Sequence, residues 1–406
     1  MYINIINVKH QIGLRKHLPE HGEDIGSMIR HQRRKMSLTL EEGAEGICSI
    51  SYLSKVENNQ IIPSDKYLEL FQQKFEISLD KLFDKNDQLI IDLIDAIFIK
   101  NKQAFSKEDF KGFDYRSKLF YLATLILLEQ YLDAKKAYFE LNPYIKNMND
   151  LELSLYLYLS ATLLEDEGRL SDAFTLLRMN EAESTNFKLK MLIETKKIIL
   201  ACKMDKHPYV TMYYDEILSE LISHEYYHLV HEIKFIYLSY MTQFFDQKKL
   251  FNELEKSLNI TAEQRNYLLI NYLYRTNEFN KSEQLLEEIH FTNSRTYLLA
   301  SIILNRLNKK EKIKTLLQHK IDTNNAHERL IIEYLKLKHV ENSSHLDQFI
   351  RIKILKQYEL ADSKDILMFW YEEGVNTFKK GGYYKDATIL CEMVIDKINT
   401  LATLRD

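Results

Sequence analysis

The feature that constrains the fold most is a weak sequence pattern that recurs between residues 100 and 400. Its two clearest copies are residues 157–177 and 371–387, which place apolar residues at helical spacing on both sides of a glycine. These glycines, Gly168 and Gly382, lie where a turn must separate two helices. One short helix pair cannot bury its apolar face alone, so such copies must stack on their neighbours. The pattern therefore predicts a series of helical hairpins.

The spacing of the copies supports this interpretation. Each copy has a marker residue early in its second expected helix, and the markers are Ala134, Ala173, Phe251, Ser282, Ile313 and Ala387. Successive markers are separated by 39, 78, 31, 31 and 74 residues, and the two long intervals equal two units of 39 and of 37. This period predicts about eight hairpins that resemble tetratricopeptide repeats, stacked as an α-solenoid.

Composition points to the same fold class. Only 10 of the 406 residues are glycine and 4 are proline. All-β folds need many turns and hence many of these residues, whereas helices need neither. We therefore expect an all-α protein.

The same sequence offers little for catalysis or secretion. Its three cysteines, Cys48, Cys202 and Cys391, are far apart, and no apolar run is long enough to span a membrane. No glycine-rich phosphate loop or catalytic triad can be identified. We expect a cytoplasmic protein that is not an enzyme, has no cofactor and does not enter a membrane. Since the net charge is −4, a nucleic-acid site must be a local patch.

Glycine usage divides the chain. Five of the ten glycines fall within the first 46 residues, which marks a separate N-terminal module. We expect an extended N-terminal arm at residues 1–21, a helix-turn-helix domain of five short helices at residues 22–86, and a helical-repeat domain for sensing and dimerisation at residues 87–406. A short polar joint at residues 84–87 is the expected boundary between the last two.

The N-terminal module has the parts of a helix-turn-helix. Thr39 and Glu42 form a capping box that begins a support helix over residues 39–45. A tight turn follows, and residues 49–57 form the expected recognition helix. Leu53 and Val56 lie on the face that would hold this helix against the domain.

The opposite face is free to contact DNA. Serine and lysine side chains bind base edges or phosphates, and apolar side chains pack on thymine methyl groups. The residues expected to bind DNA are Arg34, Ser49, Ile50, Ser51, Tyr52, Lys55 and Asn58. Residues 1–35 also carry a local excess of positive charge that suits phosphate contacts by the arm and the first helix.

Residues 25–83 resemble the Xre/Cro-type helix-turn-helix, from Ile25 through the run Leu53–Gln60 to Leu82. The turn over residues 44–49 has the length seen in PlcR and Rgg regulators. A domain of this kind followed by helical hairpins is the layout of the Rgg/NprR/PlcR/PrgX family. Gly43 departs from the family pattern, which usually has a large apolar residue there. A glycine inside a helix costs roughly 1 kcal/mol and leaves no side chain for the core.

The resemblance implies a function. Family members are cytoplasmic homodimers that bind short secreted pheromone peptides after re-import, in quorum sensing. By this resemblance we expect a transcription regulator whose dimer binds an inverted-repeat operator in double-stranded DNA. Peptide binding would change the dimer's geometry and so its fit to the operator.

A stack of such hairpins would hold the peptide on its concave face, which the first helix of each hairpin lines. An asparagine side chain can both donate to and accept from a peptide backbone, and aromatic rings supply contact area. The residues expected to bind the peptide are Tyr240, Gln243, Tyr267, Asn271, Tyr274, Arg275, Asn305 and Asn376.

Two alternatives stay open. The repeats could bind a protein partner instead of a peptide. The segment His224-Glu225-Tyr226-Tyr227-His228, followed by His231, also matches the HExxH pattern of zinc hydrolases. On one helix these imidazoles would share a face. A chain with 13 histidines produces such a match by chance, however, and no further zinc ligand is evident.

Overall fold

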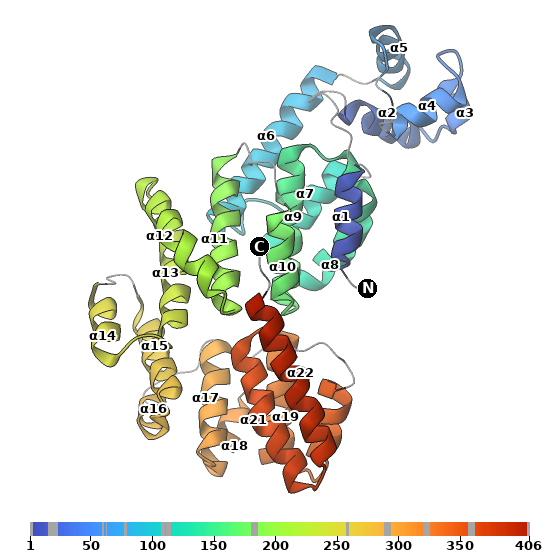
Figure 1. The fold of residues 1–406 in the computed structure, drawn as a ribbon. Coiled ribbons are helices and arrows are strands. Elements are labelled where there is room, and N and C mark those ends of the chain that lie inside the picture. The colour runs from blue at the N-terminus through green and yellow to red at the C-terminus, as the bar shows by residue number, and fades with distance from the viewer. Residues whose placement is uncertain are drawn as a thin grey trace. The chain divides into compact units, whose positions relative to one another are not determined.

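The computed structural model describes residues 3–14, 23–58, 61, 63–76, 79–106, 110, 115–179, 186–256, 260–287, 294–319, 325–355 and 362–403. Within these ranges every regular element is a helix (Figure 1). This confirms the all-α fold class. The N-terminal helices are α1 (Ile5–Gly13), α2 (Glu23–Lys35), α3 (Leu40–Ala44), α4 (Ile50–Glu57), α5 (Asp65–Phe75) and α6 (Leu79–Phe98).

Helical hairpins make up the rest of the described chain. The pairs are α7 (Tyr115–Leu127) with α8 (Tyr131–Leu141), α9 (Asp150–Asp166) with α10 (Leu170–Arg178), α11 (Phe187–Lys203) with α12 (His207–Ser223), α13 (Tyr227–Met241) with α14 (Gln247–Lys256), α15 (Ala262–Arg275) with α16 (Phe279–Leu286), α17 (Ser294–Arg306) with α18 (Lys310–Gln318), α19 (Ala326–His339) with α20 (Leu346–Ile350), and α21 (Lys364–Lys380) with α22 (Tyr384–Thr403). The 3-10 turn η2 (Asn142–Asn147) precedes α9, and the π-helical η3 (Arg351–Leu355) follows α20. These eight pairs confirm the expected number of hairpins within the described residues.

The marker residues establish the repeat register. All six lie on the second helix of a hairpin, from Ala134 on α8 to Ala387 on α22. The two long intervals skip α12 and α20, which are second helices without a recognisable marker. Ala134, Ala173 and Ile313 are fully buried, because the second helix packs its small or apolar face against the first.

Two compact units divide the chain. One comprises residues 1–163 and 175–193, and the other comprises residues 164–174 and 194–406. The expected boundary after residue 86 falls inside α6, so the polar residues 84–87 belong to a helix and form no joint.

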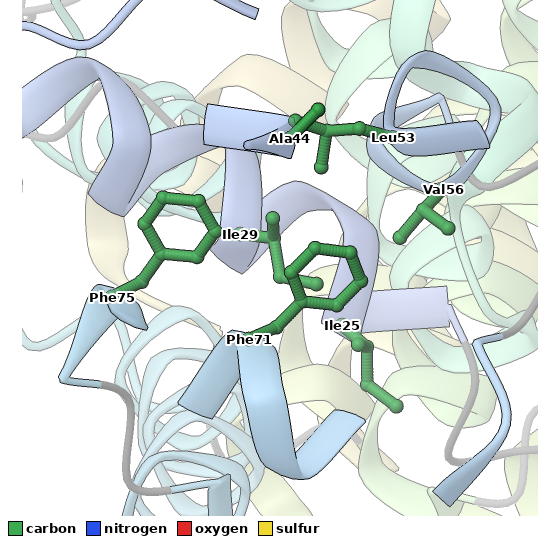
Figure 2. Packing of buried hydrophobic residues seen from close by; sticks show 7 residues of the cluster. All are labelled: Ile25, Ile29, Ala44, Leu53, Val56, Phe71 and Phe75. Carbon is green, nitrogen blue, oxygen red and sulfur yellow. The ribbon is translucent and has the colours of Figure 1, made fainter. Parts of the chain in front are cut away.

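The first unit contains the N-terminal helices. Their core consists of seven side chains from α2 to α5 (Figure 2), namely Ile25, Ile29, Ala44, Leu53, Val56, Phe71 and Phe75. Phe71 and Phe75 lie one turn apart on α5 with ring centroids 6.1 Å apart, and burying each ring contributes about 1.5–3 kcal/mol. The predicted packing of Leu53 and Val56 is confirmed, since both are fully buried.

Residues near the N-terminus differ from the expected extended arm. Residues 5–13 form α1, which Asn4 caps by accepting a hydrogen bond from the backbone N–H of Asn7. Ile3 and Val8 are buried, and α1 packs against η2. This apolar contact makes a docked helix more stable than a free arm. The remainder of the expected arm, residues 15–22, lies outside the described residues.

Candidate functional site

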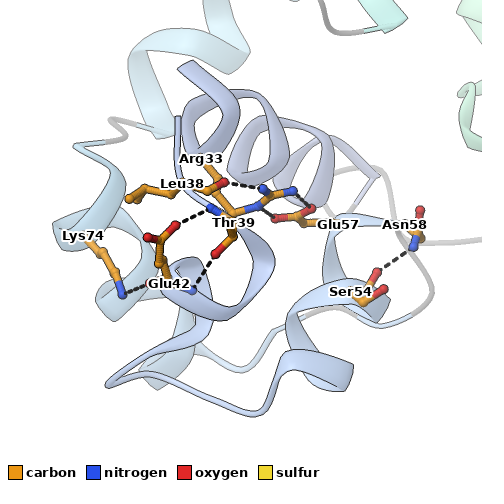
Figure 3. A network of polar contacts seen from close by, with 8 residues as sticks. All are labelled: Arg33, Leu38, Thr39, Glu42, Ser54, Glu57, Asn58 and Lys74. Carbon is orange, nitrogen blue, oxygen red and sulfur yellow. Dashed lines mark hydrogen bonds and ion pairs between the residues drawn. The ribbon is translucent and has the colours of Figure 1, made fainter. Parts of the chain in front are cut away.

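The helix-turn-helix is built on hydrogen bonds around α3. Thr39 accepts from the backbone N–H of Glu42 at 3.2 Å and donates its own N–H to the Glu42 carboxylate at 2.7 Å (Figure 3). These bonds confirm the capping box, and they lower the pKa of Glu42. Gly46 has a φ of +76°, which lets the chain turn between α3 and α4. Lys74 of α5 donates to the carbonyl oxygens of Glu42 and Glu45 at 2.6 and 2.7 Å and holds the turn in place.

A buried ion pair joins α2 to α4. The guanidinium of Arg33 donates to both carboxylate oxygens of Glu57, at 2.6 and 2.8 Å, and to the carbonyl of Leu38 at 2.6 Å (Figure 3). The hydrogen bonds to Glu57 raise the pKa of Arg33. A Cβ atom added at Gly43 would lie 2.4 Å from Cδ of Arg33. Gly43 therefore leaves room for the stem of Arg33, which explains its departure from the family pattern.

The α4 helix presents a polar face to solvent. Ser49 caps it by accepting from the backbone N–H of Tyr52 at 3.1 Å, so its hydroxyl hydrogen stays available to donate. Ser49, Ile50, Ser51 and Lys55 are exposed. These four side chains form what we call the α4 face.

The three other residues expected to bind DNA lie in different surroundings. Arg34 is exposed in the last turn of α2. Asn58 ends α4 and uses its side-chain amide to donate to the carbonyl of Ser54 at 2.8 Å. Tyr52 was expected to point outward, but it is partly buried against the domain core, with its ring 4.9 Å from that of Tyr67. The α4 turn that buries Leu53 also brings Tyr52 onto α5.

A cavity of about 220 Å³ lies within the second unit. Six of the residues expected to bind a peptide line it, namely Tyr240, Gln243, Tyr267, Asn271, Tyr274 and Arg275. Five of them come from α13 and α15, the first helices of their hairpins, and Gln243 lies in the turn after α13. The walls combine aromatic rings with amides and charges, as small-ligand sites do.

Hydrogen bonds hold Asn271 and Tyr240 at the cavity wall. Asn271 is nearly buried and donates to the carbonyl of Ser239 at 3.1 Å and to the hydroxyl of Thr242 at 3.0 Å. It was expected on a solvent-lined surface, but it bridges α15 to α13. Tyr240 lies 2.8 Å from a ring nitrogen of His207, and burial raises its pKa.

Ion pairs surround the cavity. Asp205 accepts from Gln243 at 3.0 Å and from Lys364 at 2.6 Å, and Arg275 donates to Asp365 at 2.9 Å. These bonds link the first turn of α21 to α15, the turn before α12 and the turn after α13.

A second group of charges lies around Glu165. This carboxylate pairs with Lys196 at 2.7 Å and Lys203 at 2.5 Å, and the two ammonium groups outweigh its burial and lower its pKa well below the usual range. Sequence reasoning missed Glu165, Lys203, Asp205, Lys364 and Asp365 as lining residues, because their contacts join distant segments and no local pattern marks them.

The other two residues expected to bind a peptide do not line this cavity. Asn305 is buried in a polar cluster, where it donates to Glu373 at 2.7 Å and accepts from Lys338 at 2.8 Å. His339 lies 2.8 Å from the same amide oxygen. Asn376 is exposed on α21. The Asn305 amide is thus occupied by Lys338 and His339 of α19 and by Glu373 of α21.

The HExxH segment does not lie on one helix. His224 ends α12, Glu225 has a φ of +61°, and α13 begins at Tyr227. The shared face that zinc binding needs is absent, because a turn separates the first histidine and the glutamate from the second histidine. Among the described residues, no group of three histidine, cysteine or acidic side chains could hold a metal. Among the helices of the described residues, none is long and apolar enough to cross a membrane.

The N-terminal domain and the fold have known relatives. A helix-turn-helix family matches residues 29–82. Over 63 residues the chain is 43% identical to the transcriptional activator NprA of Geobacillus stearothermophilus, and this match spans 15% of either protein. A crystal structure of NprR in complex with its cognate peptide NprX superposes with a TM-score of 0.56 at 14% identity, over 77% of this chain and 99% of that one. The apo form of the quorum sensor NprR from B. thuringiensis gives a TM-score of 0.47 at 15% identity, over 79% and 99%.

The fold and the two sites thus define a helix-turn-helix protein with a domain of helical hairpins. The likeness to peptide-bound NprR shows that both chains share this fold. The helix-turn-helix match and the similarity to NprA each cover a short part of the chain.

Proposed function

We propose that this protein is a cytoplasmic, homodimeric transcription regulator that binds DNA and is controlled by a short signalling peptide. The α4 face reads an inverted-repeat operator, and the cavity of the second unit binds the peptide. NprR, whose fold the chain shares, was crystallised with its cognate peptide, and NprA is a transcriptional activator.

The α4 face supports the DNA-binding part. Ser51 and Lys55 are exposed on a helix whose opposite side, Leu53 and Val56, is fully buried. A rigid helix of this kind fits the major groove, where a hydroxyl or an ammonium binds base edges or phosphates. Arg34, exposed at the end of α2, is suited to a phosphate contact.

The observation that carries the peptide part is the cavity itself. Six residues that the repeat pattern predicts on the inner face of successive hairpins line one cavity. Asn271 keeps its side-chain oxygen for a ligand N–H, since both of its hydrogen bonds use the amide nitrogen. Tyr267 and Tyr274 add apolar area, which gives an extended peptide both anchoring and contact surface.

Control requires that the peptide bind one conformation more tightly than another. The ion pairs of Asp205 with Lys364 and of Arg275 with Asp365 join the first turn of α21 to the cavity walls. A peptide that displaces or strengthens these pairs changes the position of α21, which is a physical route from ligand to domain geometry.

Thermal unfolding of the full chain tests the proposal. The short-peptide fraction of spent culture medium from the source organism should raise the melting temperature, because a ligand of the native state stabilises it. The increase should be lost in Gln243→Ala and kept in Asn376→Ala, which is exposed and outside the cavity. An equal increase in both variants, or none in the wild type, would refute the peptide site. Co-purification of a large protein would instead favour a protein partner.

A further inference from the structure

The cavity is lined by four cationic side chains, and three of them are paired with carboxylates. Lys203 pairs with Glu165, Lys364 with Asp205, and Arg275 with Asp365. Each pair is 2.5–2.9 Å long. Each of these three cations already has a carboxylate partner, although Lys203 shares Glu165 with Lys196. They therefore attract an anionic ligand less than an unpaired cation does.

Arg295 is the fourth cation. In the described part of the chain it forms no ion pair, although Glu328 also lines the cavity. Its guanidinium lies over two aromatic rings, 5.7 Å from the centroid of Phe235 and 6.0 Å from that of Tyr267. Each ring attracts the flat face of the guanidinium. The N–H groups along the edge of the guanidinium therefore stay free to donate.

The position of Arg295 on its helix adds to this charge. It occupies the first turn of α17, which contains no acidic residue. The N-terminus of a helix carries partial positive charge, so a cation is disfavoured there and an anion is favoured. Arg295 and the helix end therefore attract the same kind of group.

We infer that the cavity binds a peptide carboxylate, and that Arg295 binds it through paired hydrogen bonds. The planar guanidinium matches a carboxylate in this way, while Phe235 and Tyr267 fix its plane. The carboxylate belongs either to the peptide's C-terminus or to an aspartate or glutamate side chain. This inference rests on the proposed function, since it names the chemistry by which the peptide is recognised.

Three pools of short synthetic peptides of random sequence test the inference on the immobilised full chain. The first has a free C-terminal carboxylate and no acidic side chains, the second has an amidated C-terminus with acidic side chains, and the third has no carboxylate. Peptides retained after washing are identified and their affinities measured by titration. We expect retention from the first or second pool, which tells the two sources apart, and none from the third.

Variants make the test specific. Retained peptides should bind about 10-fold to 100-fold more weakly to Arg295→Gln, as expected for a lost charge-assisted contact. Arg295→Lys should recover part of the affinity, because lysine keeps the positive charge but lacks the planar pair of N–H donors. Arg265→Gln, exposed on α15 outside the cavity, should bind as the wild type does.

The outcomes separate the two claims. Equal retention of the third pool, or unchanged affinity in Arg295→Gln, would overturn the carboxylate inference and leave the peptide site standing. Failure of the wild type to retain any pool would overturn the proposed function, and the inference with it.

Discussion

Arg33 and Glu57 hold α2 and α4 together through two hydrogen bonds of 2.6 and 2.8 Å, in a place where both side chains are almost completely buried. The pair lies directly behind the helix that we propose reads DNA. The aliphatic part of the Arg33 side chain fills the space that Gly43 leaves open. The orientation of α4 thus depends on one charged contact as well as on the hydrophobic core.

Removing one partner of this pair should loosen the helix-turn-helix. Glu57→Ala leaves Arg33 buried without a counter-charge, which costs about 3–5 kcal/mol. Hydrogen exchange of the α4 amides in the full chain measures this local stability. The amides should exchange faster in Glu57→Ala, whereas Glu41→Ala, exposed on α3, should leave them unchanged. Identical protection in both variants would mean that the ion pair does not hold α4.

The α4 face should determine operator affinity. Lys55→Ala should lose about 1–3 kcal/mol of binding to an operator selected from random duplexes, with relaxed preference at one position if the lysine contacts a base. A phosphate contact would weaken binding evenly across sequences. Lys66→Ala, exposed on α5, serves as the matched control. Unchanged binding of Lys55→Ala by fluorescence anisotropy would remove α4 from the DNA interface.

Asn271 should matter for stability as well as for binding. It is nearly buried and joins α15 to Ser239 and Thr242, so Asn271→Ala should cost about 1–3 kcal/mol of stability by leaving Thr242 and the Ser239 carbonyl without this donor. Denaturant unfolding of the second unit's helices, followed by circular dichroism, checks this. The exposed Asn376→Ala variant should unfold like the wild type. Wild-type stability in Asn271→Ala would show that this bridge is not formed in solution.

His339 should make the stability of the second unit depend on pH. Burial lowers the pKa of its imidazole from 6.5 to about 4, so the folded state takes up a proton less readily than the unfolded chain. Stability from this group is complete above pH 6.5 and is lost as the pH falls from there toward 4. At about pH 5 the loss should reach about 2 kcal/mol. Unfolding at several pH values should show a smaller loss in His339→Gln, and equal losses would contradict this origin.

The hairpins could be predicted from the sequence because their spacing is regular, yet most turns carried no signal. Gly168 and Gly382 have left-handed backbones and mark two turns clearly. Other hairpins place Glu129, Asn277 or Asn308 in the same conformation. Non-glycine residues adopt it at a modest cost, so a search for glycine finds only the two strongest copies.

The cavity could be predicted only in part, for a related reason. The helical period brought Tyr267, Asn271 and Tyr274 to one face of α15. The Asn305 side-chain amide, in contrast, forms hydrogen bonds with Lys338 of α19 and Glu373 of α21. Contacts between such distant residues follow from packing and leave no trace in local spacing.

Control of DNA binding by a peptide can be measured in one titration. A selected inverted-repeat duplex, labelled with a fluorophore, is titrated with the full chain in the presence and absence of a peptide retained by the protein. We expect the peptide to shift the apparent Kd by about 10-fold, the size of a typical coupling free energy. The shift should disappear in Gln243→Ala, while peptide-free binding persists. The same Kd with and without bound peptide in the wild type would contradict peptide control.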